Sequence, residues 1–176
     1  MRAGAQSGCG ATVREGTSHP SPLPASATSG ARENLPAGPV IVVHSLVHAT
    51  AALKAAARAG RPVVLASPPG AGSYVGPGWF REVVSAARAA VPEASFSALL
   101  DCGDEVGAAL GAIRSGIEGV VFTGRADVAS RLADIAAQHG VRFLTTRPAP
   151  VLDLGDDFFA APEILERRCA ELFRQA

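Results

Sequence analysis

The chain has 176 residues, with 16 basic and 16 acidic side chains and a formal net charge of zero. This length predicts one domain with room for a short appendage. With this balanced charge we do not expect a basic surface of the kind that binds nucleic acids or anionic lipids. No apolar run approaches the ~20 residues of a membrane span, and the N-terminus lacks the apolar core of a signal peptide. We therefore expect a cytoplasmic protein without a nucleic-acid or membrane partner.

Hydrophobic residues make up 48% of the chain, but its aromatic residues are limited to seven Phe, one Tyr and one Trp. This composition predicts a core of small aliphatic side chains on closely packed backbone. The three cysteines, Cys9, Cys102 and Cys169, are far apart and odd in number. That distribution does not suggest a disulfide framework.

The first 38 residues differ from the rest in composition. They are rich in Gly, Ala, Ser, Thr and Pro, and Pro20, Pro22 and Pro24 each disfavour helix at the residue before them. Such a segment buries too little apolar surface to offset the conformational entropy lost on ordering. The sequence therefore predicts a disordered tail over 1–38 and an α/β domain over 39–176.

From Pro39 onward, short apolar runs alternate with Ala-rich stretches of helical periodicity. The apolar runs predict strands over 40–43, 62–67, 96–100, 119–122 and 141–144. The stretches between them predict helices over 46–59, 78–90, 104–116 and 126–139. Gly60 and Gly140 are suited to end two of these helices. Strands that are apolar throughout are typical of parallel sheets covered by helices.

About five consecutive βα units predict an α/β fold with right-handed crossovers. Two architectures agree with this pattern: half of a TIM-type barrel, or an open flavodoxin-like sheet. Prolines and an acidic patch interrupt the pattern over 148–159. A last amphipathic helix is predicted over 162–174. Its apolar stripe consists of Ile164, Leu165, Cys169, Leu172 and Phe173.

Ligands of parallel α/β proteins bind where the carboxyl ends of the strands meet. The small and polar residues that follow the predicted strands are therefore candidate ligand-binding residues. They are Ser45, Ser67, Gly70, Gly72, Ser73, Thr123 and Gly124. Glycines in the loop over 68–78 would let the backbone approach a phosphate, although their spacing is not that of a dinucleotide-binding fingerprint. The alternative is a surface loop that needs positive φ.

Asp101 follows an apolar strand, where a low dielectric would perturb the pKa of its carboxyl. It is a candidate general acid or base, and the alternative is that it caps the next helix beside Asp104. Cys102 is a candidate nucleophile or metal ligand. Together with His44, His48 and Asp101 it could form a zinc site of mixed ligands. Ordinary hydrogen-bonded histidines are the alternative to that zinc site.

Four consecutive units of the chain match one family pattern in register. The first is Ser45-Leu46 with the helix that follows, and the second joins Pro62-Val63-Val64-Leu65 to the loop over 70–76. The third ends in Leu100-Asp101-Cys102-Gly103, and the fourth is Gly119-Val120-Val121-Phe122-Thr123-Gly124. Over residues 40–146 the chain resembles the N-terminal half of the class II, metal-dependent fructose- and tagatose-bisphosphate aldolases.

The resemblance implies a barrel-like fold and places Asp101 where the family has its catalytic acid/base. Cys102 stands where the family has a metal-binding His, and Thr123 where it has Asp. The family's metal-binding Glu has no counterpart over 144–146, and a full barrel needs roughly 200 or more residues. We therefore expect a noncatalytic or regulatory protein that binds a small anionic ligand, for example a phosphorylated one. The alternative is a carbon–carbon lyase-like enzyme with Asp101 as acid/base and Cys102 as metal ligand or nucleophile.

A half barrel would leave the strands beginning near Val40 and Val141 as unpaired edges. Two copies related by a two-fold axis could close on each other and remove these edges. The sequence therefore predicts a homodimer, whereas an open sheet with short protected edges would be a monomer.

Overall fold

The computed structural model describes residues 37–175, so the tail predicted over 1–38 lies outside the described residues except for its last two positions. The domain is made of alternating strands and helices, as predicted. They are β1 (Val40–Val42), α1 (Leu46–Ala59), β2 (Val63–Ala66), α2 (Ala71–Tyr74), α3 (Gly76–Ala90), β3 (Phe96–Asp101), α4 (Val106–Arg114), β4 (Gly119–Val121), α5 (Ala126–Gln138), β5 (Arg142–Leu144), β6 (Leu152–Asp153), a 3₁₀ turn η1 (Gly155–Asp157) and α6 (Pro162–Gln175). No helix within 37–175 is long and apolar enough to cross a membrane.

Within the described residues, six parallel strands form one sheet in the order β5-β4-β3-β2-β1-β6. From β1 to β5, each new strand is added beside the preceding one, with Val40 opposite Val64 and Leu99 opposite Gly119. A flavodoxin-like sheet would instead place β1 between β2 and β3. Winding in a single direction is the arrangement of a half barrel, so the structure confirms that alternative and the α/β class.

Side chains of each strand alternate between two different environments, because successive residues of a strand point to opposite faces. One face, with Ile41, Leu65 and Leu100, packs into the main core under the helices. The helices pack side by side in the order α6-α1-α3-α4-α5. The other face, here called the inner face, carries a separate apolar cluster. This cluster consists of Val40, Val64, Leu99, Val121 and Leu144, with Ala66 packed against it.

Helix α1 has the bounds that the sequence predicts. The hydroxyl of Ser45 caps its first turn by accepting a hydrogen bond from the amide of His48 at 3.3 Å. Gly60 ends the helix in the left-handed region, with φ at 61°. Between these ends, side chains such as Ala52 and Ala56 are fully buried. Their small size lets the helix lie close to the sheet and to its neighbours.

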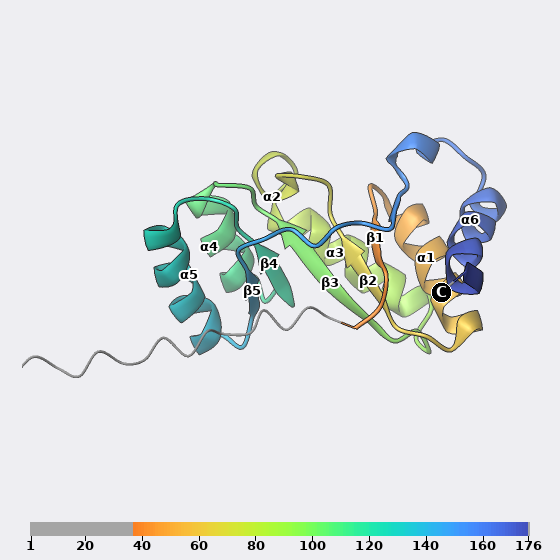
Figure 1. Cartoon of the computed structure of the whole chain (residues 1–176), viewed down its shortest axis with the longest axis horizontal. Coiled ribbons are helices and arrows are strands. Elements are labelled where there is room, and N and C mark those ends of the chain that lie inside the picture. The colour runs from red at the N-terminus through yellow and green to blue at the C-terminus, as the bar shows by residue number, and fades with distance from the viewer. Residues whose placement is uncertain (1–36, 176) are drawn as a thin grey trace, which may run out of the picture. The chain divides into compact units, whose positions relative to one another are not determined.

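The chain after β5 crosses the sheet instead of ending at its edge. Residues 145–151, here called the crossing segment, run from β5 to the far side of β1 (Figure 1). There β6 pairs with β1 in parallel, and the amides of Val151 and Leu154 donate to the carbonyls of Val40 and Val42 at 2.9 and 3.1 Å. The expectation of an unpaired edge near Val40 is therefore wrong. A strand of two residues next to prolines leaves no periodic pattern in the sequence.

Helix α6 packs along α1. Leu165, Cys169 and Phe173 of the predicted stripe are buried, whereas Ile164 is 40% exposed and lies off the stripe. Glu166 lies between two cations of α1, 2.8 Å from the Lys54 ammonium and 2.9 Å from the Arg58 guanidinium.

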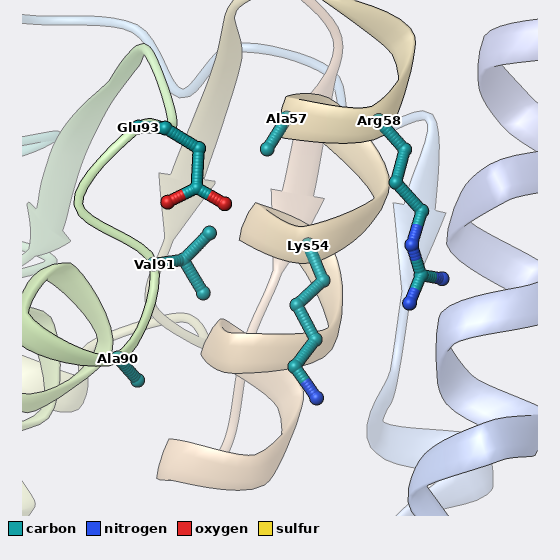
Figure 2. Close-up of a pocket in the computed structure, with 6 residues that line it drawn as sticks. All are labelled: Lys54, Ala57, Arg58, Ala90, Val91 and Glu93. Carbon is teal, nitrogen blue, oxygen red and sulfur yellow. The ribbon is translucent and has the colours of Figure 1, made fainter.

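An open pocket of about 390 Å³ adjoins these ion pairs, between α1 and the segment after α3. Figure 2 shows Arg58 extending toward α6, with Val91 and Glu93 across the pocket from α1. Because helix α1 runs antiparallel to β1, its last turns lie where the strands begin. This pocket is therefore at the opposite end of the sheet from the predicted site.

We expect Glu166→Gln to lower the free energy of unfolding at neutral pH by about 1 kcal/mol or less, as for a partly exposed ion pair. The hydrogen bond from Lys54 is the largest influence on the carboxyl and, with Arg58, outweighs burial, so the pKa of Glu166 lies below its ordinary value. A lowered folded-state pKa stabilises the protein above the unfolded-state pKa, and this contribution is lost as the pH falls through the folded-state pKa. The difference between Glu166→Gln and wild type should therefore vanish in acid.

Urea unfolding at neutral pH and well below the usual Glu pKa of about 4.3 measures this difference. The control is Glu171→Gln, because Glu171 is 51% exposed and lies 3.8 Å from its partner Arg174. If Glu166→Gln lowers the free energy of unfolding by the same amount at both pH values, the pKa of Glu166 is not lowered by its ion pairs.

Candidate functional site

The carboxyl ends of β2 and β3 bring Ser67 and Asp101 together. The amide of Asp101 donates to the Ser67 hydroxyl oxygen at 2.9 Å, and this hydroxyl donates to the carbonyl of Pro68 at 3.1 Å. Both residues are 2% exposed. Ser67 is therefore engaged with its own neighbours and holds the end of β3 against the loop after β2.

Two amide donors and one cation surround the carboxylate of Asp101. Its Oδ1 accepts hydrogen bonds from the amides of Gly70 and Gly103 at 2.7 and 2.9 Å. Both glycines have positive φ, 65° and 57°, which turns their amides toward this oxygen without strain. The Oδ2 atom lies 2.6 Å from the guanidinium of Arg147 in the crossing segment. Asp101 does not cap α4, whose N-cap is Glu105.

The crossing segment fills the inner face beside Asp101. Arg147, Pro148 and Pro150 lie against inner-face side chains of four strands. These side chains are Val42, Ala66, Leu99, Asp101 and Val121. The space left between them is about 10 Å³. That is room for no more than about one water molecule. A ligand could reach Asp101 from this side only if the crossing segment moved away.

Cys102 lies on the opposite face of β3 from Asp101, because adjacent strand residues alternate. It is fully buried in the main core. A Cβ added to Gly72 would lie 2.6 Å from its sulfur, so the thiol sits directly against the backbone of α2. Burial, followed by the charge of Asp101, raises the pKa of Cys102 to about 12. At neutral pH the thiol is protonated, and this form is neither a strong nucleophile nor a metal ligand.

The two histidines after β1 bond to protein groups. The amide of His44 donates to Nδ1 of His48 at 3.3 Å, and Nε2 of His44 lies 2.7 Å from Oδ1 of Asp153. Burial alone would raise the pKa of Asp153, but the Gly155 amide and His44 together lower it below its ordinary value. His48 is fully buried, and burial is the main cause that lowers its pKa. It is therefore neutral and able to accept a hydrogen bond.

The described part of the chain does not form the zinc site of mixed ligands that the sequence suggested. Among residues 37–175, no three side chains of the His, Cys, Asp and Glu types are grouped so that they could hold a metal ion. The sulfur of Cys102 is held in the helix-covered core, and His44 is paired with Asp153 of β6. The structure does not bring His44 and Cys102 into one ligand group.

The other expected ligand-binding residues lie around the same strand ends, but they bond to or pack against groups of the protein itself. Ser45 caps α1, and the Ser73 hydroxyl donates to the carbonyl of Gly70 at 2.7 Å. The amide of Thr123 donates to the carbonyl of Gly103 at 2.7 Å. A Cβ at Gly124 would overlap the ring of Phe122. These groups hold the loops in place.

A pocket that the sequence analysis missed lies beside these loops, at the carboxyl ends of β1 and β2. Its volume is about 120 Å³. The residues of this aromatic pocket are His44, Pro68, Ala71, Tyr74, Val75, Trp79 and Phe158. Two of its rings are solvent-exposed, Tyr74 at 64% and Phe158 at 46%. One signal was in the sequence: the chain's single Tyr and single Trp lie within one short loop and the helix after it.

No protein-family model and no curated protein matches the sequence. In three dimensions, the chain is similar to a protein from Coccidioides immitis, described as "a putative fructose-1,6-biphosphate aldolase", with a TM-score of 0.51 and 20% sequence identity. The similarity covers 61% of this chain and 40% of that protein, so this chain spans less than half of its neighbour. At this identity the comparison shows a shared fold, an aldolase-like half barrel.

We expect Arg147→Met to lower the free energy of unfolding by about 3–5 kcal/mol, because it leaves a buried carboxylate without its cation. Asp101→Asn should cost less, about 1–3 kcal/mol, because an amide oxygen can still accept from the two glycine amides. In Asp101→Asn, Arg147 is left without its partner, but its side chain is 32% exposed and can turn to water. Urea unfolding of both variants and of the double variant measures the interaction energy between Asp101 and Arg147.

The double variant should be more stable than the sum of the two single losses implies. Arg125→Met is the matched control, because Arg125 and its partner Asp127 are 80% and 54% exposed, and it should change stability by less than about 1 kcal/mol. Strictly additive losses at Asp101 and Arg147 would show that the two side chains do not interact.

Proposed function

We propose that this chain is a noncatalytic protein built on half of a class II aldolase-like barrel, and that it binds a small ligand in the aromatic pocket. The observation that carries the proposal is the ion pair between Asp101 and Arg147. It neutralises the one carboxylate that the aldolase resemblance identifies as an acid/base. Its cation, Arg147, belongs to the crossing segment, which covers the inner face.

Acid–base catalysis needs a carboxyl that can reach the substrate and exchange a proton with it. The Asp101 side chain is 3% exposed, two amides donate to its Oδ1, and the Arg147 guanidinium forms an ion pair with its Oδ2. Cys102, one residue further along, is a buried and protonated thiol on the other face. The alternative of an enzyme with altered chemistry at these two residues therefore has little support.

The aromatic pocket supports the binding part of the proposal. It lies at the carboxyl ends of parallel strands, where α/β proteins bind their ligands. Exposed rings such as Tyr74 and Phe158 leave apolar surface in water, a feature that is common at binding sites. None of the residues lining the pocket is Lys or Arg. We therefore favour a ligand without a phosphate group over the anionic ligand expected from the glycine-rich loop.

We expect no cleavage of fructose-1,6-bisphosphate or tagatose-1,6-bisphosphate above the buffer rate, with or without added zinc. The physical reason is that neither Asp101 nor a metal ligand set is available to the substrate. A coupled assay for the triose phosphate product measures the rate in wild type, Asp101→Asn and Asp104→Asn. Zinc-dependent cleavage that is lost in Asp101→Asn and kept in Asp104→Asn, where the replaced side chain is exposed, would overturn the proposal.

A further inference from the structure

We propose that the ligand of the aromatic pocket is a small organic cation of the quaternary alkylammonium class. This inference rests on the binding function proposed above and adds the chemical class of the ligand. Three features of the pocket carry it: the rings in its wall, the charges around it and its volume.

Rings from three separate parts of the chain meet at this pocket. Tyr74 comes from α2, Trp79 from α3, and Phe158 from the residue after η1. The faces of Trp, Tyr and Phe rings attract organic cations through their electron density, and Trp does so most strongly. The rest of the wall includes Pro68, Ala71 and Val75, which offer apolar surface to alkyl groups. A cation that carries methyl groups can use both kinds of contact.

The charges near the pocket favour a cation over an anion. His44 is the one side chain in the wall that could carry a positive charge, and the Asp153 carboxylate 2.7 Å from its Nε2 would balance that charge. Two neighbouring guanidinium groups, those of Arg147 and Arg168, are paired with Asp101 and Asp157. An anionic ligand would therefore find no free cation in the wall. An organic cation would meet no unbalanced positive charge.

The volume of the pocket limits the size of the ligand. About 120 Å³ is available. An engineered apolar cavity of about 150 Å³ binds benzene, so this volume suits a ligand of about that size. A nitrogen atom bearing four small alkyl groups has about this size, whereas a sugar bisphosphate is much larger.

Trp79 makes the test direct, because it is the only Trp of the chain and lines the pocket. Its fluorescence is measured while the full chain is titrated with choline, with 3,3-dimethyl-1-butanol and with inorganic phosphate. The butanol is the uncharged isostere of choline, with carbon in place of nitrogen. We expect a saturable change with choline, binding at least tenfold weaker for the isostere, and no saturable change with phosphate.

Variants locate the binding. Tyr74→Leu and Phe158→Leu should each weaken choline binding several-fold, while Tyr74→Phe keeps the ring and should bind as wild type does. Phe159→Leu is the control for the loss of a neighbouring ring, because Phe159 contacts the Phe158 ring but is 96% exposed and does not line the pocket. Circular dichroism of each variant verifies that it folds.

The outcomes separate this inference from the proposed function. Equal binding of choline and its isostere would overturn the cation class and leave a ligand-binding pocket in place. Saturable binding of phosphate would overturn it in favour of an anionic ligand. No saturable change with any of the three probes would overturn both the cation class and the binding function of this pocket. Choline binding that Tyr74→Leu and Phe158→Leu leave unchanged would also overturn the assignment to this site.

Discussion

A buried carboxylate remains charged in a protein interior only if hydrogen-bond donors and a cation surround it. Asp101 meets this condition with two amides from neighbouring loops and the guanidinium of Arg147. The two amides belong to the loops after β2 and β3, so the carboxylate fixes both loops. Arg147 comes from the far end of the domain, so the same carboxylate also fixes the path of the chain after β5.

The crossing segment solves a problem that half a barrel creates. In a full barrel, the inner faces of opposite strands bury one another. Here the apolar side chains of the inner face are partly covered by Pro148 and Pro150. Proline has no amide hydrogen, so an extended proline-rich chain can lie on an apolar surface with fewer unpaired donors than other residues would leave. Beyond this segment, β6 pairs with β1, and α6 packs on α1.

The crossing segment also determines where open space remains at the carboxyl ends of the strands. With the inner face filled beside Asp101, the open space at the strand ends lies further out, beside β1. The aromatic pocket is formed there from α2, α3 and the residue after η1. The resemblance to aldolases is therefore informative about the scaffold. The open pocket at its strand ends is lined by residues outside that resemblance's catalytic positions.

Local patterns were sufficient to predict most of the scaffold. The cap at Ser45 and the glycine at 60 fixed the bounds of α1, and apolar runs located five strands. The alternation of strand residues is also enough to place Asp101 and Cys102 on opposite faces of β3. It could not have shown that Arg147 reaches Asp101 or that His44 reaches Asp153. Those contacts join distant parts of the chain and leave no periodic signal.

Helix α2 and strand β6 were missed for a related reason. With four and two residues, they span only about one period of the patterns that would reveal them, so no repeat can show in the sequence. The aromatic pocket depends on α2 and on the turn after β6, so it could not be assembled from the sequence. The homodimer remains a prediction, although one of the two edges on which it was based is covered by β6.

We conclude that the chain after β5 is a fixed structural element, which covers part of the inner face and pairs with β1. Hydrogen–deuterium exchange at the amides of Val151 and Leu154 tests it most directly, because these amides donate to the carbonyls of β1. If the account is right, both amides exchange as slowly as those of the central strands, at rates set by opening of the whole domain. Exchange at the rate of an unstructured loop, with the central strands still protected, would contradict it.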